Sequence, residues 1–417
     1  MGVDLRQVVA GVLTLTMFVM LGNMIKRDHF DSITEKLPGD MQDVAMVAEQ
    51  GLHTIAKMGK GPWLEDGQEL KPCWSKSNFD VLPKSKGFVT FSLTNGPEHH
   101  VSQIAEAVVV ANVLQATLVV PDIRGSKPGD ERKFEDIYNV EKFIESLHGV
   151  VRVVKELPDE ISIRDLAVVK VPNRVTEGHV RENIYPIFKA KGNIRMATFF
   201  PSVNMRKATE KTNTDSITCL AMFGSLELQL EVNEVVDSMV ERLRALSRKS
   251  DGQFVAVDLR VDLLDNKGCH ESGLTRRKSC YNAHEIAIFL QKIGYDRDTT
   301  IYLTQSRWDS SLSVLKDTFP KTYTKESIMP ADKKDKFLET EDSEYEKVID
   351  FYICSQSDVF VPAMSSLFYA NVAGKRIASG KTQILVPAEI SSSSASAADF
   401  ISPYILKKNH LAHSCFC

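Results

Sequence analysis

Apolar residues after position 87 fall into short runs that alternate between the spacing of a strand and the spacing of a helix. FVTFS (88–92) and TLVVPDI (117–123) are typical of strands, VSQIAEAVVVANVLQA (101–116) predicts a helix, and TNGPEHH (94–100) predicts a turn. Strand and helix patterns continue at VEKFIESL (140–147), VVRVVKEL (150–157) and LAVVKV (166–171). Strands that alternate with helices predict a parallel sheet covered on both faces.

A second series with the same alternation begins at an amphipathic helix that carries Val232, Val236 and Leu243 on one stripe and ends at Gly252. The strands predicted after it are FVAVDL (254–259), TTIYLT (299–304), VFVPA (359–363) and TQILVPA (382–388). The helices are AHEIAIFLQKIG (283–294), SLSVLKDTF (311–319), EYEKVIDFYICSQ (344–356) and SLFYANVAGK (366–375). We therefore expect two doubly wound α/β units with a cleft between them, and a ligand at the carboxyl ends of the strands.

The first 86 residues do not show this alternation of strand and helix patterns. Residues 7–25 are 19 uncharged positions, which as a helix would span about 28 Å, close to the thickness of a bilayer core. A cleaved signal peptide fits less well, because the run is long and no small-x-small cleavage site follows it. We expect a short tail (1–6), a transmembrane signal anchor (7–25), a polar stem (26–86), a first unit (87–230) and a second unit (231–417). The flanking charges alone do not decide the orientation of the anchor.

Composition and cysteine content narrow the class of protein. The formal charge of -4 in 417 residues gives no basic footprint for nucleic acid. The seven cysteines make no paired metal-ligand pattern. Cys269 and Cys280 bracket a polar loop and either bridge it in an oxidising compartment or stay free thiols. The ending Cys415-Phe416-Cys417 resembles a prenylation signal, which we set aside because an anchor is already expected. The chain has no Asn-x-Ser/Thr sequon.

One charged residue stands at the end of a predicted core strand. Arg260 follows FVAVDL and has Asp258 and Asp262 on either side of it. The three side chains would share one face if the strand continued. Two interpretations are open: a local ion pair that only stabilises the strand end, or a guanidinium that faces a ligand anion and is oriented by the acids. The second is chemically specific, because a guanidinium makes two parallel hydrogen bonds to a phosphate.

A second segment has the features of an anion site. In VIDFYICSQSDVFVPAMSSLF (348–368) a helix and a strand lead to Ser365 and Ser366, which open a further helix. Hydroxyls and backbone N–H groups at a helix start bind anions, although a serine there is more often a simple N-cap. Asp350, in the helix before the strand, would by default be a solvated carboxylate.

These segments carry a resemblance to a known family. FVAVDLRVDLLDNKGC (254–269) resembles the His-Leu-Arg motif of the GDP-fucose protein O-fucosyltransferase family, and the segment 349–368 resembles its donor-site motif. Features of the family's plant branch are Ile301-Tyr302-Leu303, Phe319-Pro320 and Ser357–Pro362. The segments 1–11, 87–103 and 122–138 are similar to the plant group named mannan-synthesis-related. The resemblance covers nearly the whole chain.

The resemblance implies a fold and a chemistry. It implies a GT-B-like enzyme with two facing Rossmann-like domains, an acceptor-side domain at 87–230 and a nucleotide-sugar domain at 231–417. It implies inversion at the sugar carbon without a bound metal. By position, Arg260 matches the arginine on the donor β-phosphate and Asp350 the acid on the nucleotide base. Ser365 and Ser366 match the hydroxyl pair at the phosphate.

The sequence departs from the family at two places. Asp258 stands where the family has a histidine, and the family's Gly-Gly…Asn-Gln turn is replaced by Asn95–His100. These changes leave the donor open, with GDP-fucose first and GDP-mannose and UDP-rhamnose behind it. They also leave the general base open. An inverting transfer needs a group that accepts the acceptor's proton, and the candidates are Glu98, His99, His100 and Asp258.

Three functional hypotheses follow. The first is a Golgi type II membrane glycosyltransferase with a luminal catalytic domain, which transfers a sugar, fucose first, to a polysaccharide or glycan acceptor in mannan biosynthesis of the plant cell wall. The second is an inert relative that keeps the fold and supports a mannan synthase partner. The third is a membrane protein of unknown activity that faces the cytosol.

Overall fold

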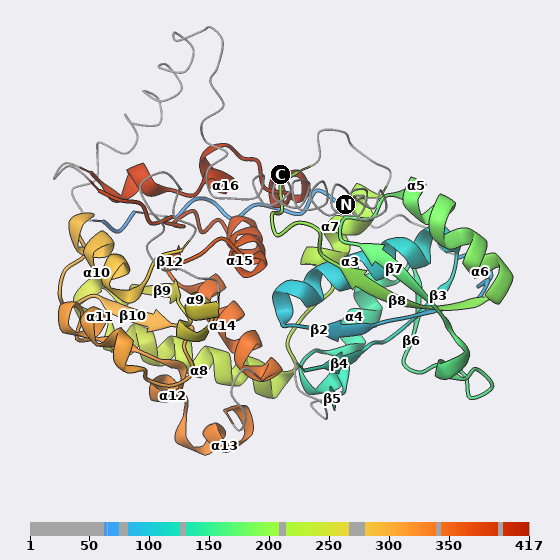
Figure 1. Cartoon of the computed structure of the whole chain (residues 1–417), viewed down its shortest axis with the longest axis horizontal. Helices are drawn as coiled ribbons and strands as arrows, with labels where there is room; N and C mark the ends of the chain where they lie inside the picture. The colour runs from blue at the N-terminus through green and yellow to red at the C-terminus, as the bar shows by residue number, and fades with distance from the viewer. Residues whose placement is uncertain are drawn as a thin grey trace, which may run out of the picture.

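The protein consists of two α/β units that lie side by side (Figure 1). The computed structural model describes residues 62–64, 66–74, 82–125, 131–207, 214–266, 280–338, 343–390 and 395–416. The described main sheets are parallel, which confirms the predicted α/β class. The expected anchor lies outside the described residues, and within them no helix has the length and apolar character to span a membrane.

The first unit has a five-stranded parallel sheet in the order β6-β3-β1-β8-β7. Its strands are β1 (Phe88–Thr90), β3 (Thr117–Val119), β6 (Arg152–Val154), β7 (Ala167–Pro172) and β8 (Asn193–Phe199). A small sheet beside it has β2 (Ser92–Thr94), β4 (Asp122–Arg124) and β5 (Glu131–Arg132). The helices are α3 (Pro97–Leu114), α4 (Val140–Leu147), α5 (Glu177–His179), α6 (Tyr185–Lys191) and α7 (Asp215–Phe223). The sequence pattern does not predict β8, because only Ile194 and Met196 of this strand are buried apolar positions.

Helix α3 begins earlier than the sequence predicts. The turn expected at 94–100 is wrong in its second half, since Pro97 to His100 form the first helical turn. Gly96 is the N-cap with φ 90°, a conformation that glycine adopts without steric cost. Pro97 follows it and suits the first helical position, where no backbone N–H is needed for the helix. Glu98, His99 and His100 therefore lie on a rigid helix start.

The second unit has a four-stranded parallel sheet in the order β11-β10-β9-β12. Its strands are β9 (Phe254–Asp258), β10 (Thr300–Leu303), β11 (Thr322–Tyr323) and β12 (Val359–Pro362). The helices are α8 (Leu230–Leu246), α9 (Val261–Asn266), α10 (Ala283–Lys292), α11 (Ser313–Thr318), α12 (Lys325–Ile328), α13 (Lys334–Phe337), α14 (Glu344–Gln356), α15 (Leu367–Ala378), α16 (Pro403–Leu406) and α17 (Ala412–Cys415). β9, β10 and β12 are buried throughout, which explains their uninterrupted apolar runs.

The last predicted strand, 382–388, is wrong in extent. Ile384 makes a single bridge to Phe360, and Leu385 makes one to Ile401. The chain passes beside β12 without forming a continuous ladder.

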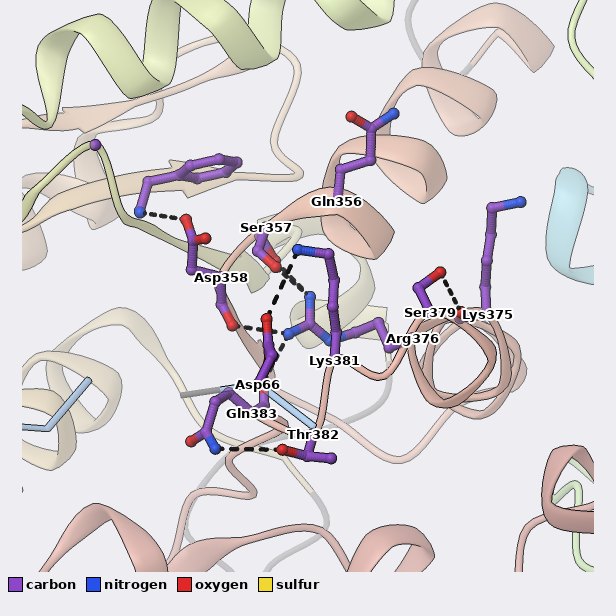
Figure 2. Close-up of polar contacts among 12 residues, drawn as sticks. Asp66, Gln356, Ser357, Asp358, Lys375, Arg376, Ser379, Lys381, Thr382 and Gln383 are labelled. Atoms are coloured by element: carbon purple, nitrogen blue, oxygen red, sulfur yellow. Dashed lines mark hydrogen bonds and ion pairs between the residues drawn. The ribbon is translucent and has the colours of Figure 1, made fainter. Parts of the chain in front are cut away.

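A buried arginine on α15 holds this region together (Figure 2). Arg376 is fully buried, and burial lowers its pKa to about 10, so the guanidinium stays charged at neutral pH. One terminal nitrogen donates to the carbonyls of Cys354 (3.0 Å) and Ser357 (2.6 Å) and to Ser357 Oγ (3.0 Å). The other donates to the carbonyls of Asp358 and Gln383, each at 2.9 Å. The guanidinium thus ties the end of α14 and the start of β12 to the chain that follows α15.

A disulfide between Cys219 and Cys415 joins α7 to α17. Cys73 and Cys280 are disulfide-bonded as well, whereas Cys354 is a buried free thiol. The expected partner of Cys280, Cys269, lies outside the described residues. Because Cys415 is bonded to Cys219, prenylation at that cysteine has no support.

Residues 66–74 of the expected stem pack on the folded protein. Gly67 N donates to the carbonyl of Gly380 (2.8 Å), and Cys73 N donates to that of Cys415 (2.9 Å). This segment connects the edge of the second unit to the disulfide region.

We expect Arg376→Met to lower the free energy of unfolding by about 3–5 kcal/mol, because it leaves buried carbonyls without their charged donor. Chemical denaturation of the full chain measures the change. Arg248→Met, at an exposed position, is the matched control and should change the value by less than about 0.5 kcal/mol. Equal stabilities of the two variants would contradict the role given to Arg376.

Candidate functional site

The carboxyl edge of the second sheet carries Arg260 and the start of α15. β9 lies between β10 and β12, and its last residue, Asp258, is in register with Pro362 at the end of β12. Ala363 N donates to the carbonyl of Asp258 (3.1 Å), which holds the two strand ends together. The Arg260 guanidinium carbon lies 5.3 Å from the ring centre of Phe368, in the first turn of α15. The structure therefore brings Arg260 and the predicted serine pair to one edge.

Arg260 forms the ion pair that one interpretation of the sequence expected. Its terminal nitrogen lies 3.4 Å from Asp258 Oδ1, and Asp258 is only 1% exposed. Thr304 Oγ1 donates to the same carboxylate oxygen at 3.1 Å. The strand does not continue through Asp262, because α9 begins at Val261 and Asp262 is exposed on it. Of the two acids, Asp258 is therefore the one that pairs with Arg260 and orients it.

The two serines have different positions. Ser366 is the N-cap of α15, and its Oγ accepts a hydrogen bond from Tyr369 N at 3.0 Å. This is the ordinary capping role that the sequence also allowed. Ser365 is half-buried just before the cap. The N–H groups of the first helical turn complete an edge that suits an anion.

Asp350 lies inside the second unit. It is buried on α14, with Tyr302 Oη donating to Oδ1 and Lys325 Nζ donating to Oδ2, both at 2.7 Å. Burial raises the pKa of Asp350 to about 6, and the positive charge of Lys325 opposes the rise. Both carboxylate oxygens already have protein partners, so the contact with a nucleotide base stays a prediction.

Glu98 approaches the site from the first unit. It lies in the first turn of α3, is 7% exposed, and its carbonyl accepts a hydrogen bond from Asn371 Nδ2 of α15 at 3.0 Å. Among the described residues, no hydrogen-bond partner reaches its buried Oε2. Burial raises the pKa of Glu98 to about 7, and the nearby charge of Arg260 opposes the rise. The positive charge of Arg260 in the second unit therefore favours the ionised form of a carboxylate in the first unit.

The two histidines are poorer candidates for a base. His100 is fully buried, with Nδ1 2.8 Å from Tyr138 Oη and Nε2 3.2 Å from Glu344 Oε2. His99 is half-buried, with Nδ1 3.0 Å from the carbonyl of Asn95, and burial lowers its pKa to about 4. His99 is neutral at physiological pH and His100 is enclosed. Glu98 and Asp258 each have a buried carboxylate oxygen that no hydrogen-bond partner reaches among the described residues, but Asp258 is paired with Arg260, which leaves Glu98 as the candidate base.

Glu344, at the start of α14, fixes the position of the α3 turn. Its Oε2 accepts a hydrogen bond from Gly96 N (2.9 Å), and its Oε1 lies 3.1 Å from Lys347 Nζ. Burial alone would raise the pKa of Glu344, but His100 and Lys347 outweigh burial and lower it. The sequence gives no sign of this role, since an acid in the first turn of a helix is an ordinary feature. Lys325 and Asn371 were also missed, because a lysine or an asparagine on a helix is just as ordinary in sequence.

A metal site is not evident in the part of the chain that the structure describes. No group of three or more His, Cys, Asp and Glu side chains there is arranged to hold an ion. The expectation of a metal-independent reaction stays a prediction.

Comparison with known proteins agrees with the resemblance. The family model of GDP-fucose protein O-fucosyltransferase matches residues 88–378. Protein MANNAN SYNTHESIS-RELATED 2 of Arabidopsis thaliana is 64% identical over 100% of both chains. Protein MANNAN SYNTHESIS-RELATED of Trigonella foenum-graecum is 48% identical over 99% of each chain. The crystal structure of POFUT1 in complex with GDP-fucose aligns with a TM-score of 0.46 and 13% identity, over 74% of this chain and 99% of that one.

We expect Glu344→Ala to lower the free energy of unfolding by about 2–4 kcal/mol at pH 7, because it leaves Gly96 N and Lys347 without their acceptor. The folded-state pKa of Glu344 lies below 4.5, so its ionic contribution is present above that pH and is lost as the pH falls through the folded value. The difference between Glu344→Ala and the native chain should therefore shrink in acid. Melting curves at pH 7 and pH 4 measure it, with exposed Glu234→Ala as the control. A difference that grows in acid would contradict the assignment.

Proposed function

The chain belongs to the GDP-fucose protein O-fucosyltransferase family, and we propose that it is a glycosyltransferase that acts in mannan synthesis. The observation that carries the proposal is that residues of both units meet at α15: the Arg260 guanidinium lies 5.3 Å from the ring centre of Phe368, and Asn371 bonds the carbonyl of Glu98 from the first unit. Arg260 supplies a cation for the leaving group, and Glu98 supplies a carboxylate for the acceptor. We propose a GT-B-like arrangement in which two Rossmann-like units face each other across this pair. GDP-fucose is the first choice of donor, ahead of GDP-mannose and UDP-rhamnose.

The proposed reaction is an inverting transfer without a metal. The bond between the sugar C1 and the diphosphate oxygen breaks as a bond forms from an acceptor hydroxyl oxygen to C1. The hydroxyl proton goes to the Glu98 carboxylate, whose pKa of about 7 suits a general base. The electron pair leaves with the nucleotide diphosphate. Arg260 and the N–H groups at the start of α15 stabilise this developing charge, with Ser365 and Ser366 beside it.

Asp258 has a defined part in this proposal. It replaces the family's histidine and would repel a phosphate if it stood alone. Its position 3.4 Å from Arg260 and its bond from Thr304 turn it into the group that orients the cation. The same ion pair between Asp258 and Arg260 also supports a second candidate function. If the ion pair persists, Arg260 is unavailable to a donor, and the protein is an inert support for a mannan synthase.

The disulfides support a luminal location. A bond between Cys219 and Cys415 forms and persists in oxidising compartments such as those of the secretory pathway. Together with the expected anchor at 7–25, this favours a single-pass type II protein of the Golgi membrane. Under this proposal the catalytic units face the lumen, and protease added to intact vesicles should leave them uncut.

We expect Arg260→Ala to weaken binding of the donor nucleotide and to lower transfer by about 10²–10³-fold, since a fixed cation at the leaving group is lost. In a plant that lacks the protein, the variant should then fail to restore mannan content at normal abundance. Arg248→Ala is the control for the loss of an arginine. Full rescue by Arg260→Ala would favour the inert support.

We expect Glu98→Gln to lower transfer by about 10²–10⁴-fold while donor binding is kept. In the native protein, activity should fall as the pH drops below about 7, because the base becomes protonated. The matched control is Glu135→Gln, an exposed acid in the same unit.

Stability separates this effect from misfolding. The pKa of Glu98 is raised from 4.5 to about 7 in the folded state, so the native protein loses stability as the pH rises between these values. Glu98→Gln lacks this loss and should melt at a higher temperature than the native protein at pH 8. A variant that is both fully active and no more stable at pH 8 would remove Glu98 from the mechanism.

A further inference from the structure

A cavity of about 740 Å³ lies at the carboxyl edge of the first sheet and is separate from the Arg260 edge. Its floor comes from the ends of β1 and β3 and from Arg195 of β8, and its wall comes from the chain after β6, residues 155–164. β1 lies in the middle of the sheet, with β3 on one side and β8 on the other, so the strand order changes direction at β1. Open α/β sheets bind ligands at such a point.

Polar side chains at the base of the cavity are linked to one another by hydrogen bonds. Asp122 Oδ1 accepts from Ser92 Oγ and Oδ2 accepts from Arg124 Nε, both at 2.6 Å. Arg195 donates to the same Ser92 Oγ at 3.1 Å. The side chains of Asp122 and Arg124 are each 41% exposed, so both keep capacity for hydrogen bonds to a ligand. Fixed planar donors and acceptors side by side match the paired hydroxyls of a sugar ring.

The charges around the cavity favour a neutral ligand. The basic lining residues are Arg124, Lys155, Arg164 and Arg195, and the acidic ones are Asp122, Glu131, Glu156 and Asp159. Four charges of each sign cancel, so neither a polyanion nor a polycation gains from the net field. Leu157, Pro158, Ile161 and Ile163 add apolar surface, and Ile163 is 58% exposed. Polar groups beside apolar surface suit a carbohydrate, which has hydroxyl edges and C–H faces.

Strand β2 leads along the chain from the cavity toward Glu98. The strand runs from Ser92 in the cavity to Thr94, and Glu98 follows on the first turn of α3. Three strand residues cover roughly 10 Å. A single sugar would not span this distance, whereas a short oligosaccharide would.

We propose that this cavity binds a neutral oligosaccharide acceptor and feeds its end toward Glu98. The assignment rests on the proposed glycosyltransferase function. It adds the acceptor class and the residues that recognise it: Asp122, Arg124 and Arg195 for the hydroxyls, and Ile163 for an apolar face.

The test is binding of manno-oligosaccharides to the full chain, made in a host that forms disulfides and measured by titration calorimetry. Asp122→Ala should weaken binding by about tenfold or more, the loss of one to two hydrogen bonds to a ligand. Ile163→Glu, at an exposed position, should weaken it several-fold without affecting the fold. Val168→Glu is the matched control, since Val168 is 64% exposed and lies outside the cavity lining.

Binding of GDP and the melting temperature are measured on each variant. Both should be unchanged in Ile163→Glu, which keeps the test valid if Asp122→Ala folds poorly. Unaltered oligosaccharide binding in Ile163→Glu and Asp122→Ala would overturn the assignment. No binding by the native chain, or tighter binding of oligogalacturonate than of manno-oligosaccharide, would also overturn it.

The outcomes separate this assignment from the proposed function. Oligosaccharide binding that depends on Asp122, in a chain that uses no donor, would support the cavity and refute the glycosyltransferase. Donor-dependent transfer that is unchanged in the Asp122 and Ile163 variants would support the glycosyltransferase and refute the cavity assignment.

Discussion

The buried carboxylate of Glu344 is the contact on which the site depends. It lies on α14 of the second unit but bonds the backbone N–H of Gly96, directly before the helix that carries Glu98. Its ionised state is kept by His100 and Lys347, so the contact has charge on one side and a fixed backbone donor on the other. Asn371 adds a bond from α15 to the carbonyl of Glu98. These hydrogen bonds fix the two units relative to each other at the place where the proposed reaction needs residues from both units.

Charge balance in the site follows from this arrangement. Glu98 is buried, and its raised pKa reflects the cost of an ionised carboxylate that the charge of Arg260, and to a smaller extent that of Lys347, partly offsets. Arg260 in turn is shared with Asp258, which burial and Thr304 hold in place. A donor phosphate that arrives at Arg260 would draw on the same cation. Its arrival would raise the pKa of Glu98, so donor binding and protonation of the base are coupled.

The sequence was informative where a residue's role follows from its own segment. The alternation of apolar runs predicted β9, β10, β12 and α14, because buried parallel strands and long helices have clear periods. It missed β8, which has few buried apolar positions, and it assigned Pro97–His100 to a turn because Gly96 and Pro97 serve turns and helix starts alike. Arg260, Asp258 and Glu98 could be nominated from motifs, but the choice among the four bases could not. That choice depends on burial and partners supplied by Glu344 and Tyr138, which are distant in sequence.

The central claim is that the pair formed by Glu98 and Arg260 is an active centre for sugar transfer. The most direct measurement is product analysis by mass spectrometry after the full-length native protein is incubated with manno-oligosaccharides and, in turn, GDP-fucose, GDP-mannose and UDP-rhamnose. The account predicts release of the nucleotide diphosphate and the addition of one sugar to the oligosaccharide, with GDP-fucose the preferred donor. Neither transfer to the oligosaccharide nor hydrolysis of any of the three donors would contradict it.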